Sequence, residues 1–309
     1  MTRNQGSVLV TDPQNSPITR RDLLRFSALG AAALGGGSLL SACSTTDPGN
    51  PQSASEGIQA RIDSGQPVRI AIGNEPPYTK LLPNGELTGA APDIAKAVLE
   101  RLGAGDVQGI TTPYESMIPG LDAGRWDMIA AGLFMNQSRC AEVLYASPDI
   151  VSTESLAVPA GNPKNLNTVD DIKAQNVKVA VLAASFELKT AKSLGIPESQ
   201  LPTYPLAPDA LQGMEAGRVD AILLPTLSLE QLKEDQGGSF EITEPLDDFP
   251  LTGSGAAFAK SDQAFRDKYN KEMEAFKQTP AFDKIMNEWG FDAEAAREAT
   301  IKELCKTEG

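Results

Sequence analysis

The sequence of 309 residues contains no histidine and only three cysteines. Without histidine, the chain cannot form a Ser/His/Asp or Cys/His nucleophilic site, or a zinc site with histidine ligands. No cysteine pair and no group of aspartates has the spacing of a metal site, so we expect neither a metal nor another cofactor. These absences favour a protein that binds a molecule over one that transforms it.

Basic residues are also scarce. The chain has 27 lysines and arginines against 41 aspartates and glutamates, which gives a formal charge of −14. A protein with this charge repels a phosphate backbone, so we expect no nucleic-acid partner. The same field disfavours anionic ligands and is compatible with cations and zwitterions.

One long uncharged stretch lies near the N-terminus. Residues 26–42 carry no charge and follow the paired arginines Arg20 and Arg21. The stretch is short and glycine-rich for a permanent membrane span, and it has the form of a twin-arginine export signal covering residues 1–42. We therefore expect an extracytoplasmic protein.

The signal ends in Leu40-Ser41-Ala42-Cys43, which is similar to the lipobox of bacterial lipoproteins. In such proteins the cysteine is lipidated and becomes the first residue of the mature chain, so Cys43 would anchor this protein to the membrane. An ordinary cleaved signal followed by a chance cysteine is the alternative. Residues 43–65 are rich in Ser, Thr, Pro, Gly and Gln, and they are expected to form a flexible tether.

Lipidation of Cys43 would leave Cys140 and Cys305 as the remaining cysteines. Two cysteines in an oxidising compartment have a single pairing, so we predict a disulfide between them. Two free thiols are the alternative. The disulfide would tie the C-terminus to the middle of the chain.

An internal repeat indicates two lobes of similar build. Val68–Ile72 reads as a strand and has a counterpart in residues 177–181, and residues 118–129 align with residues 211–222. In both copies of the longer segment a helix ends at a glycine, and a buried strand starts just after an aspartate. We expect an α/β protein whose first lobe comprises residues 66–156 and 257–309 and whose second lobe comprises residues 157–256. Short extended crossings between the lobes are expected at Glu154–Pro159 and residues 254–259.

Several helices are expected around these strands. Residues 92–102 show a helical period that stops at Gly103, and Ser261 and Thr279 are each placed to cap a helix near the C-terminus. The aromatic residues of the last two helices share one face. We assign them to the core.

A polar stretch follows one predicted strand and is a candidate for a binding site. Residues 128–131 are apolar and lead through Gly132 to Phe134 and Arg139. Ligands of open α/β sheets bind beyond the carboxyl ends of strands, although a core phenylalanine and a solvated arginine are an equal alternative at this point. In the second lobe, Ser185 is placed to cap a helix over residues 186–194. The free N–H groups at the start of that helix could hold a carboxylate, or the helix could simply be capped.

Taken together, the motifs resemble the type II solute-binding proteins of ABC importers, in the polar-amino-acid family. The resemblance covers nearly the whole mature chain and rests on Gly89-x-x-x-Asp93-Ile94, Ala123-Gly124-Arg125-x-Asp127, Gly132 with Arg139, Ser147-Pro148 and Ala216-Gly217-Arg218-x-Asp220. It implies a two-lobed periplasmic binding protein type II fold, with each lobe a mixed sheet flanked by helices. It also implies a monomer that closes about a hinge on a ligand between the lobes and delivers the ligand to an ABC permease and its ATPase.

The chain departs from the α-amino-acid pattern of this family at two places. Phe134 stands where amino-acid binders commonly carry a small hydroxyl residue. Pro225 and Thr226 stand where those proteins place the aspartate that holds the α-ammonium group. A buried ammonium group without an anionic partner is unstable, so the departures argue against an ordinary α-amino acid as the ligand.

An aromatic set takes the place of those polar groups. Tyr78, Tyr114 and Phe134 all come from loops of one lobe, and aromatic faces attract diffuse cations. Arg139 could hold a carboxylate, and Glu75 could accept N–H bonds from the ligand, which a quaternary ammonium group lacks. This combination suits the cyclic amidinium of ectoine or hydroxyectoine better than a betaine.

More closely, the chain resembles the ectoine- and hydroxyectoine-binding proteins of such importers. The similar stretches are Arg139-Cys140, residues 161–166, Gly195-Ile196-Pro197 and Glu303-Leu304-Cys305. In those relatives the aromatic box, the glutamate and the arginine contact the ligand, and these roles carry over to Tyr78, Tyr114, Phe134, Glu75 and Arg139. Candidates from the second lobe rest on position alone, and they are Ser185, Phe186, Glu187 and Thr226.

Three other functions remain open on the sequence. The protein could bind another polar amino acid or a betaine. It could be an enzyme similar to cyclohexadienyl dehydratase, with Glu75 as general acid. A purely structural lipoprotein fits the signal but leaves the paired lobes unexplained.

Overall fold

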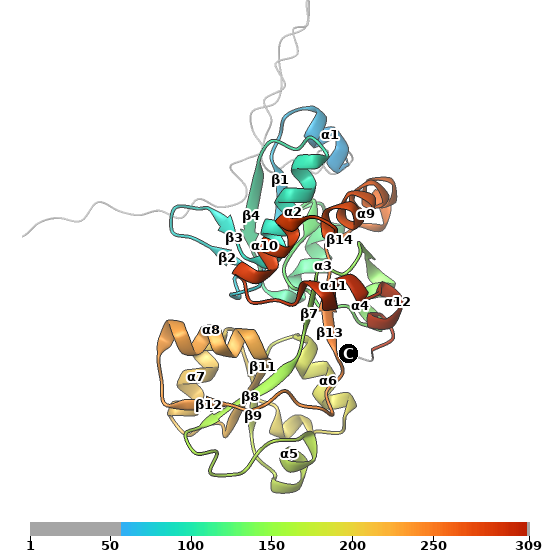
Figure 1. Ribbon diagram of the computed structural model, residues 1–309. Coiled ribbons are helices and arrows are strands. Elements are labelled where there is room, and N and C mark those ends of the chain that lie inside the picture. Colours follow the sequence, from blue (N-terminus) through green and yellow to red (C-terminus); the bar gives the residue numbers. More distant parts are fainter. Residues whose placement is uncertain (1–56, 308–309) are drawn as a thin grey trace, which may run out of the picture. The chain divides into compact units, whose positions relative to one another are not determined.

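The computed structural model describes residues 57–307, which contain two five-stranded mixed sheets (Figure 1). The predicted export signal, the predicted lipidation site Cys43 and the predicted tether as far as residue 56 lie outside the described residues. Within residues 57–307, no helix is both long enough and apolar enough to span a membrane.

The first sheet has the strand order β4-β1-β5-β14-β6. β1 pairs in parallel with β4 and β5, whereas β14 runs antiparallel to β5 and β6. We call this sheet and its helices the first lobe. Its strands are β1 (Val68–Ile72), β4 (Val107–Thr111), β5 (Met128–Ile129), β6 (Leu144–Tyr145) and β14 (Ala257–Phe258). Its longer helices are α2 (Ala90–Arg101), α3 (Tyr114–Asp122), α9 (Gln263–Lys277) and α10 (Pro280–Glu288).

The second sheet has the strand order β10-β9-β11-β8-β12. β9 runs parallel to β10 and β11, and β8 runs antiparallel to β11 and β12. We call this sheet and its helices the second lobe. Its strands are β8 (Glu154–Pro159), β9 (Val179–Leu182), β10 (Thr203–Tyr204), β11 (Ala221–Pro225) and β12 (Phe240–Ile242). Its helices are α5 (Val169–Gln175), α6 (Phe186–Ser193), α7 (Ala207–Glu215) and α8 (Thr226–Gln236).

The sequence repeat corresponds to one structural device in each lobe. Asp127 accepts a hydrogen bond from the backbone N–H of Arg69 at 2.7 Å, and Asp220 accepts one from the backbone N–H of Lys178 at 2.8 Å. Each aspartate thus fixes the start of one buried strand against its neighbour. The glycines before them, Gly124 and Gly217, have φ angles of 66° and 68° and end α3 and α7 in the left-handed region.

Two strands connect the sheets, and they lie slightly before the expected crossings. β7 (Ile150–Ser152) pairs antiparallel with β13 (Thr252–Ser254), side by side in Figure 1. Glu154–Pro159, which the sequence suggested as a crossing, is instead β8, between β11 and β12. Its first five residues are all buried, as in the interior of a sheet covered on both faces, and a short apolar run in the sequence cannot distinguish such a strand from a crossing. The lobe bounds drawn from the sequence stay a proposal.

The predicted tether extends too far along the chain. Residues 58–63 form helix α1 (Ile58–Asp63), and Ile58 and Ile62 are buried in the core. These two side chains are four residues apart and so lie on one helical face. Arg61 adds an ion pair of 3.1 Å to Asp127.

The two expected C-terminal helices are present, but one begins differently. The Thr279 hydroxyl accepts from the Phe282 N–H and caps α10 as expected. α9 begins at Gln263 after a 3₁₀ turn over Lys260–Asp262, with Asp262 and not Ser261 at the N-cap position. The aromatic residues Phe265, Tyr269, Phe276 and Phe282 are buried.

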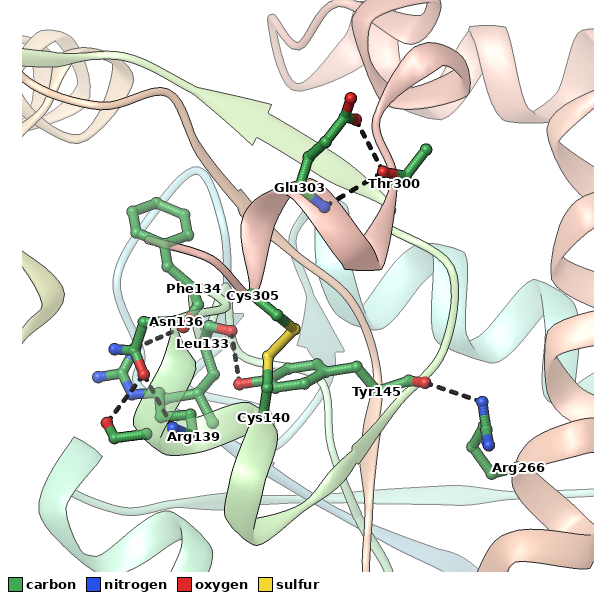
Figure 2. Close-up of a disulfide and its surroundings, with 11 residues drawn as sticks. Leu133, Phe134, Asn136, Arg139, Cys140, Tyr145, Arg266, Thr300, Glu303 and Cys305 are labelled. Atoms are coloured by element: carbon green, nitrogen blue, oxygen red, sulfur yellow. Dashed lines mark hydrogen bonds between the residues drawn. A yellow bond between two sulfur atoms is a disulfide. The ribbon is translucent and has the colours of Figure 1, made fainter. Parts of the chain in front are cut away.

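A disulfide joins Cys140 on α4 (Gln137–Glu142) to Cys305, which follows α12 (Ile301–Leu304), with an S–S distance of 1.95 Å (Figure 2). Two further contacts hold the same region. The Tyr145 hydroxyl donates to the Leu133 carbonyl at 3.2 Å, and the Thr300 hydroxyl accepts from the Glu303 N–H to cap α12. α4, which carries Arg139, is therefore tied to the C-terminal segment by a covalent bond.

Candidate ligand-binding site

A small cavity is lined by residues of both lobes. The lining residues are Glu75, Tyr78, Tyr114, Gly132, Phe134, Arg139, Ser185, Phe186, Glu187 and Pro225. All the site residues expected from the sequence are among them except Thr226.

Thr226 lies beside the cavity but does not line it. It is the first residue of α8, and its hydroxyl is 2.9 Å from the Thr153 hydroxyl and 2.8 Å from the Ser155 hydroxyl. These hydrogen bonds join the start of α8 to Ser155 on β8 and to Thr153, which immediately precedes β8. The Thr226 hydroxyl thus forms its hydrogen bonds with neighbouring side chains outside the cavity lining.

The aromatic wall centres on Phe134. Its ring packs edge-to-face against Tyr78 at a centroid distance of 5.7 Å and against Phe186 of the second lobe at 5.8 Å. The Tyr78 hydroxyl donates to the Ser152 hydroxyl on β7 at 2.6 Å, so its ring is held in a fixed orientation. Gly132 permits this packing, because its φ angle is 65° and a Cβ atom there would lie 2.7 Å from the Tyr78 ring.

Glu75 is held from both lobes. Tyr114 donates its hydroxyl to Oε2 at 2.9 Å, and Ser228 on α8 donates its hydroxyl to Oε1 at 2.8 Å. Burial raises the pKa of Glu75, while these two hydrogen bonds lower it. Each carboxylate oxygen has room for a second donor, so Glu75 can accept an N–H from a ligand as well.

Arg139 contributes a buried positive charge, with 7% of its surface exposed. Nη1 donates to the Phe134 carbonyl at 2.8 Å, and Nη2 donates across the cleft to the Ala184 carbonyl at 3.2 Å. The Asn136 side chain accepts from the Arg139 N–H and caps α4 (Figure 2). Each terminal nitrogen carries a second hydrogen, so the guanidinium can also bind a carboxylate in a bidentate manner.

Two buried glutamates of the second lobe complete the charges of the site. Glu187 on α6 is 4% exposed and lines the cavity, and burial together with nearby Glu75 raises its pKa to about 7. Glu154 at the start of β8 is 1% exposed, and burial together with Glu187 raises its pKa well above the usual range. Glu154 and Ser228 were not predicted from the sequence. Glu154 is the first residue of β8, and Ser228 lies in the first turn of α8, two residues beyond the predicted Thr226.

The family follows from a match over most of the chain. Residues 68–293 match the model of the bacterial extracellular solute-binding proteins, family 3. The chain belongs to this family. A curated relative, the probable amino-acid ABC transporter periplasmic-binding protein y4tE of Sinorhizobium fredii, is 34% identical over 249 residues, which are 77% of this chain and 82% of that protein.

Solved structures agree with this assignment. The crystal structure of EhuB in complex with hydroxyectoine is similar at 36% identity and a TM-score of 0.76, covering 84% of this chain and 99% of that one. The ancestral amino acid-binding protein AncCDT-1, a precursor of cyclohexadienyl dehydratase, aligns at 23% identity and a TM-score of 0.66, over 74% of this chain and 97% of that one. This second likeness shows the fold alone.

The family fixes the general role of the protein. It is an extracytoplasmic solute-binding protein of an ABC transporter for amino-acid-like ligands, with a permease as its partner. It is not an enzyme, because its relatives are binding proteins of transporters. The two-lobed type II fold expected from the sequence is confirmed.

The bond from Ser228 to Glu75 predicts how one substitution acts. Ser228→Ala should weaken ligand binding by about 1–3 kcal/mol, because a hydrogen bond from one lobe to a charged group of the other is lost. Isothermal titration measures the affinity, and small-angle scattering measures lobe closure. Ser155→Ala is the matched control, because Ser155 is also buried and bonds within its own lobe. Equal losses in both variants would contradict a role for Ser228 across the cleft.

Proposed function

We propose that this protein captures ectoine or hydroxyectoine and delivers it to its permease. The observation that carries the proposal is a compact cavity in which one guanidinium, one carboxylate held from both lobes and three aromatic rings converge. An ectoine is a small zwitterion with a carboxylate and a flat, delocalised cation that donates N–H bonds. Each of these parts has a complementary group in the cavity.

The ligand carboxylate binds Arg139. Arg139 lines the cavity together with Ser185 and the start of α6, and Ser185 caps that helix by accepting from the Leu188 N–H at 3.1 Å. The positive end of the helix dipole adds a smaller attraction for the carboxylate.

The ligand cation lies among Tyr78, Tyr114 and Phe134. An aromatic face attracts a delocalised cation, and desolvation in a small cavity strengthens the attraction. Glu75 accepts an N–H of the amidinium, with its own position fixed by Tyr114 and Ser228. A quaternary betaine has no N–H for Glu75, and an α-ammonium group would meet Pro225 where other family members present an aspartate.

The hydroxyectoine complex of EhuB supports the same assignment, because that protein is 36% identical over nearly its whole length. The remaining expectations from the sequence complete the proposal. The chain is exported by a twin-arginine signal over residues 1–42, anchored by a lipid on Cys43, and acts as a monomer on a tether.

A titration panel tests the ligand. Purified protein should bind ectoine and hydroxyectoine with measurable heat and a raised melting temperature, and it should bind arginine, glutamine and glycine betaine far more weakly. Clear binding of arginine or glutamine together with no response to either ectoine would refute the proposal. Binding of betaine at an affinity equal to that of ectoine would remove the role given to Glu75.

Substitutions of Phe134 test the aromatic wall. Phe134→Ala should weaken ectoine binding by about 1–3 kcal/mol, because it removes both apolar contact and the ring face. Phe134→Leu keeps most of the apolar volume and should lose only the cation–π part, about 0.5–2 kcal/mol. Tyr78→Phe is the control, since it keeps the ring and removes only the bond to Ser152. An unchanged affinity in Phe134→Ala would place the ligand elsewhere.

A further inference from the structure

The carboxyl group of Glu154 lacks the hydrogen-bond donors that would stabilise it as a negatively charged carboxylate. Its Oε2 atom is buried and has no hydrogen-bond donor in the described residues. Its Oε1 lies 3.2 Å from the Thr252 hydroxyl, but that hydroxyl has a single hydrogen and a closer acceptor, the Ser152 carbonyl at 3.0 Å. An ionised carboxylate at this position would be both desolvated and nearly without hydrogen bonds, which is strongly unfavourable.

The groups that face Glu154 make ionisation still less favourable. Glu187 lies within hydrogen-bonding reach of it, and Glu75 and Tyr78 lie near enough to act on it through their charges or dipoles. The one cation of the described cavity, Arg139, acts on Glu187 and forms its hydrogen bonds with the carbonyls of Phe134 and Ala184. Two carboxylates in contact have no hydrogen to share, whereas one proton between them satisfies the buried oxygen of Glu154.

We propose that Glu154 is a neutral carboxylic acid whose O–H donates to the Glu187 carboxylate, so that Glu154 is a positioning residue for the cavity wall. Glu154 lies opposite Pro225 in the pairing of β8 with β11, and Pro225 and Glu187 both line the cavity. The proton therefore sits directly behind the lining. Glu187 is thereby held as a carboxylate that faces the cavity beside Glu75.

This arrangement has a consequence for the class of ligand. With Glu154 neutral, Glu75 and Glu187 present two carboxylates to the cavity, and Arg139 presents one cation. A cation that donates N–H bonds on two sides matches the pair of carboxylates, and the ligand carboxylate matches Arg139. The inference thus rests on the proposed function for the ligand, but the protonation of Glu154 does not.

The first experiment needs no ligand. Isotope-edited infrared spectroscopy of protein labelled at the glutamate carboxyl carbon, at neutral pH, should show the C=O stretch of a protonated carboxyl group, and Glu154→Gln should remove it. The absence of a protonated glutamate at neutral pH, or a band that persists unchanged in Glu154→Gln, would overturn the proposal. This outcome is independent of whether ectoine is the ligand.

The second experiment compares two variants in ectoine binding. Glu154→Gln keeps a donor toward Glu187 and should bind within about threefold of the wild type at neutral pH, whereas Glu154→Leu has no donor and should bind about tenfold or more weakly. Melting curves establish that both variants fold. Equal weakening in Glu154→Gln and Glu154→Leu would overturn the donor role.

The pH profile adds a test that a merely structural role would not pass. Loss of the shared proton as the pH rises places three carboxylates together and removes the O–H bond that positions Glu187, so wild-type affinity should fall once that proton is lost, by up to about tenfold per pH unit. Glu154→Gln cannot lose that proton and should hold its affinity over the same range. A wild-type affinity that rises with pH, or identical profiles in both proteins, would overturn the proposal. If ectoine fails to bind the wild type at all, the proposed function fails while the infrared result still decides the state of Glu154.

Discussion

A buried guanidinium needs a full set of acceptors, and the arrangement of the site follows from how Arg139 obtains them. Two carbonyls, from Phe134 in the first lobe and Ala184 in the second, accept its hydrogen bonds. The helix that carries it is capped by Asn136 and held to the C-terminal segment by the Cys140–Cys305 disulfide. A cation fixed in this way lines the cavity and has hydrogens left for a ligand carboxylate.

The two lobes share the task of binding, because neither contains a complete site. The first lobe supplies the aromatic rings, Glu75 and Arg139, and the second supplies the start of α6 and Ser228. Two of the hydrogen bonds that cross the cleft, Ser228 to Glu75 and Arg139 to Ala184, involve the two charged groups that we propose hold the ligand. Closure of the lobes therefore also forms the hydrogen bonds that orient the two charged groups, as expected for a hinge-closing binding protein.

Much of this could be predicted from the sequence, because the relevant signals are local. Gly132, Phe134 and Arg139 follow one buried strand, and the aspartates Asp127 and Asp220 mark the repeat that the structure explains by their bonds to strand starts. Residues that depend on pairing between distant segments were missed or misplaced. Glu154–Pro159 was expected to cross between lobes and is a strand of the second sheet, since only its partners β11 and β12 decide that. Thr226 was expected at the cavity, but Ser228, two residues further along α8, faces Glu75, because successive helix positions turn by about 100°.

A crystal structure of this protein with hydroxyectoine bound tests the central claim most directly, because that claim concerns which atoms meet. The account predicts the ligand carboxylate on the guanidinium of Arg139 and the cationic ring among Tyr78, Tyr114 and Phe134, with an N–H directed at Glu75. A ligand bound in the opposite orientation, or bound outside the cavity between the lobes, would contradict it.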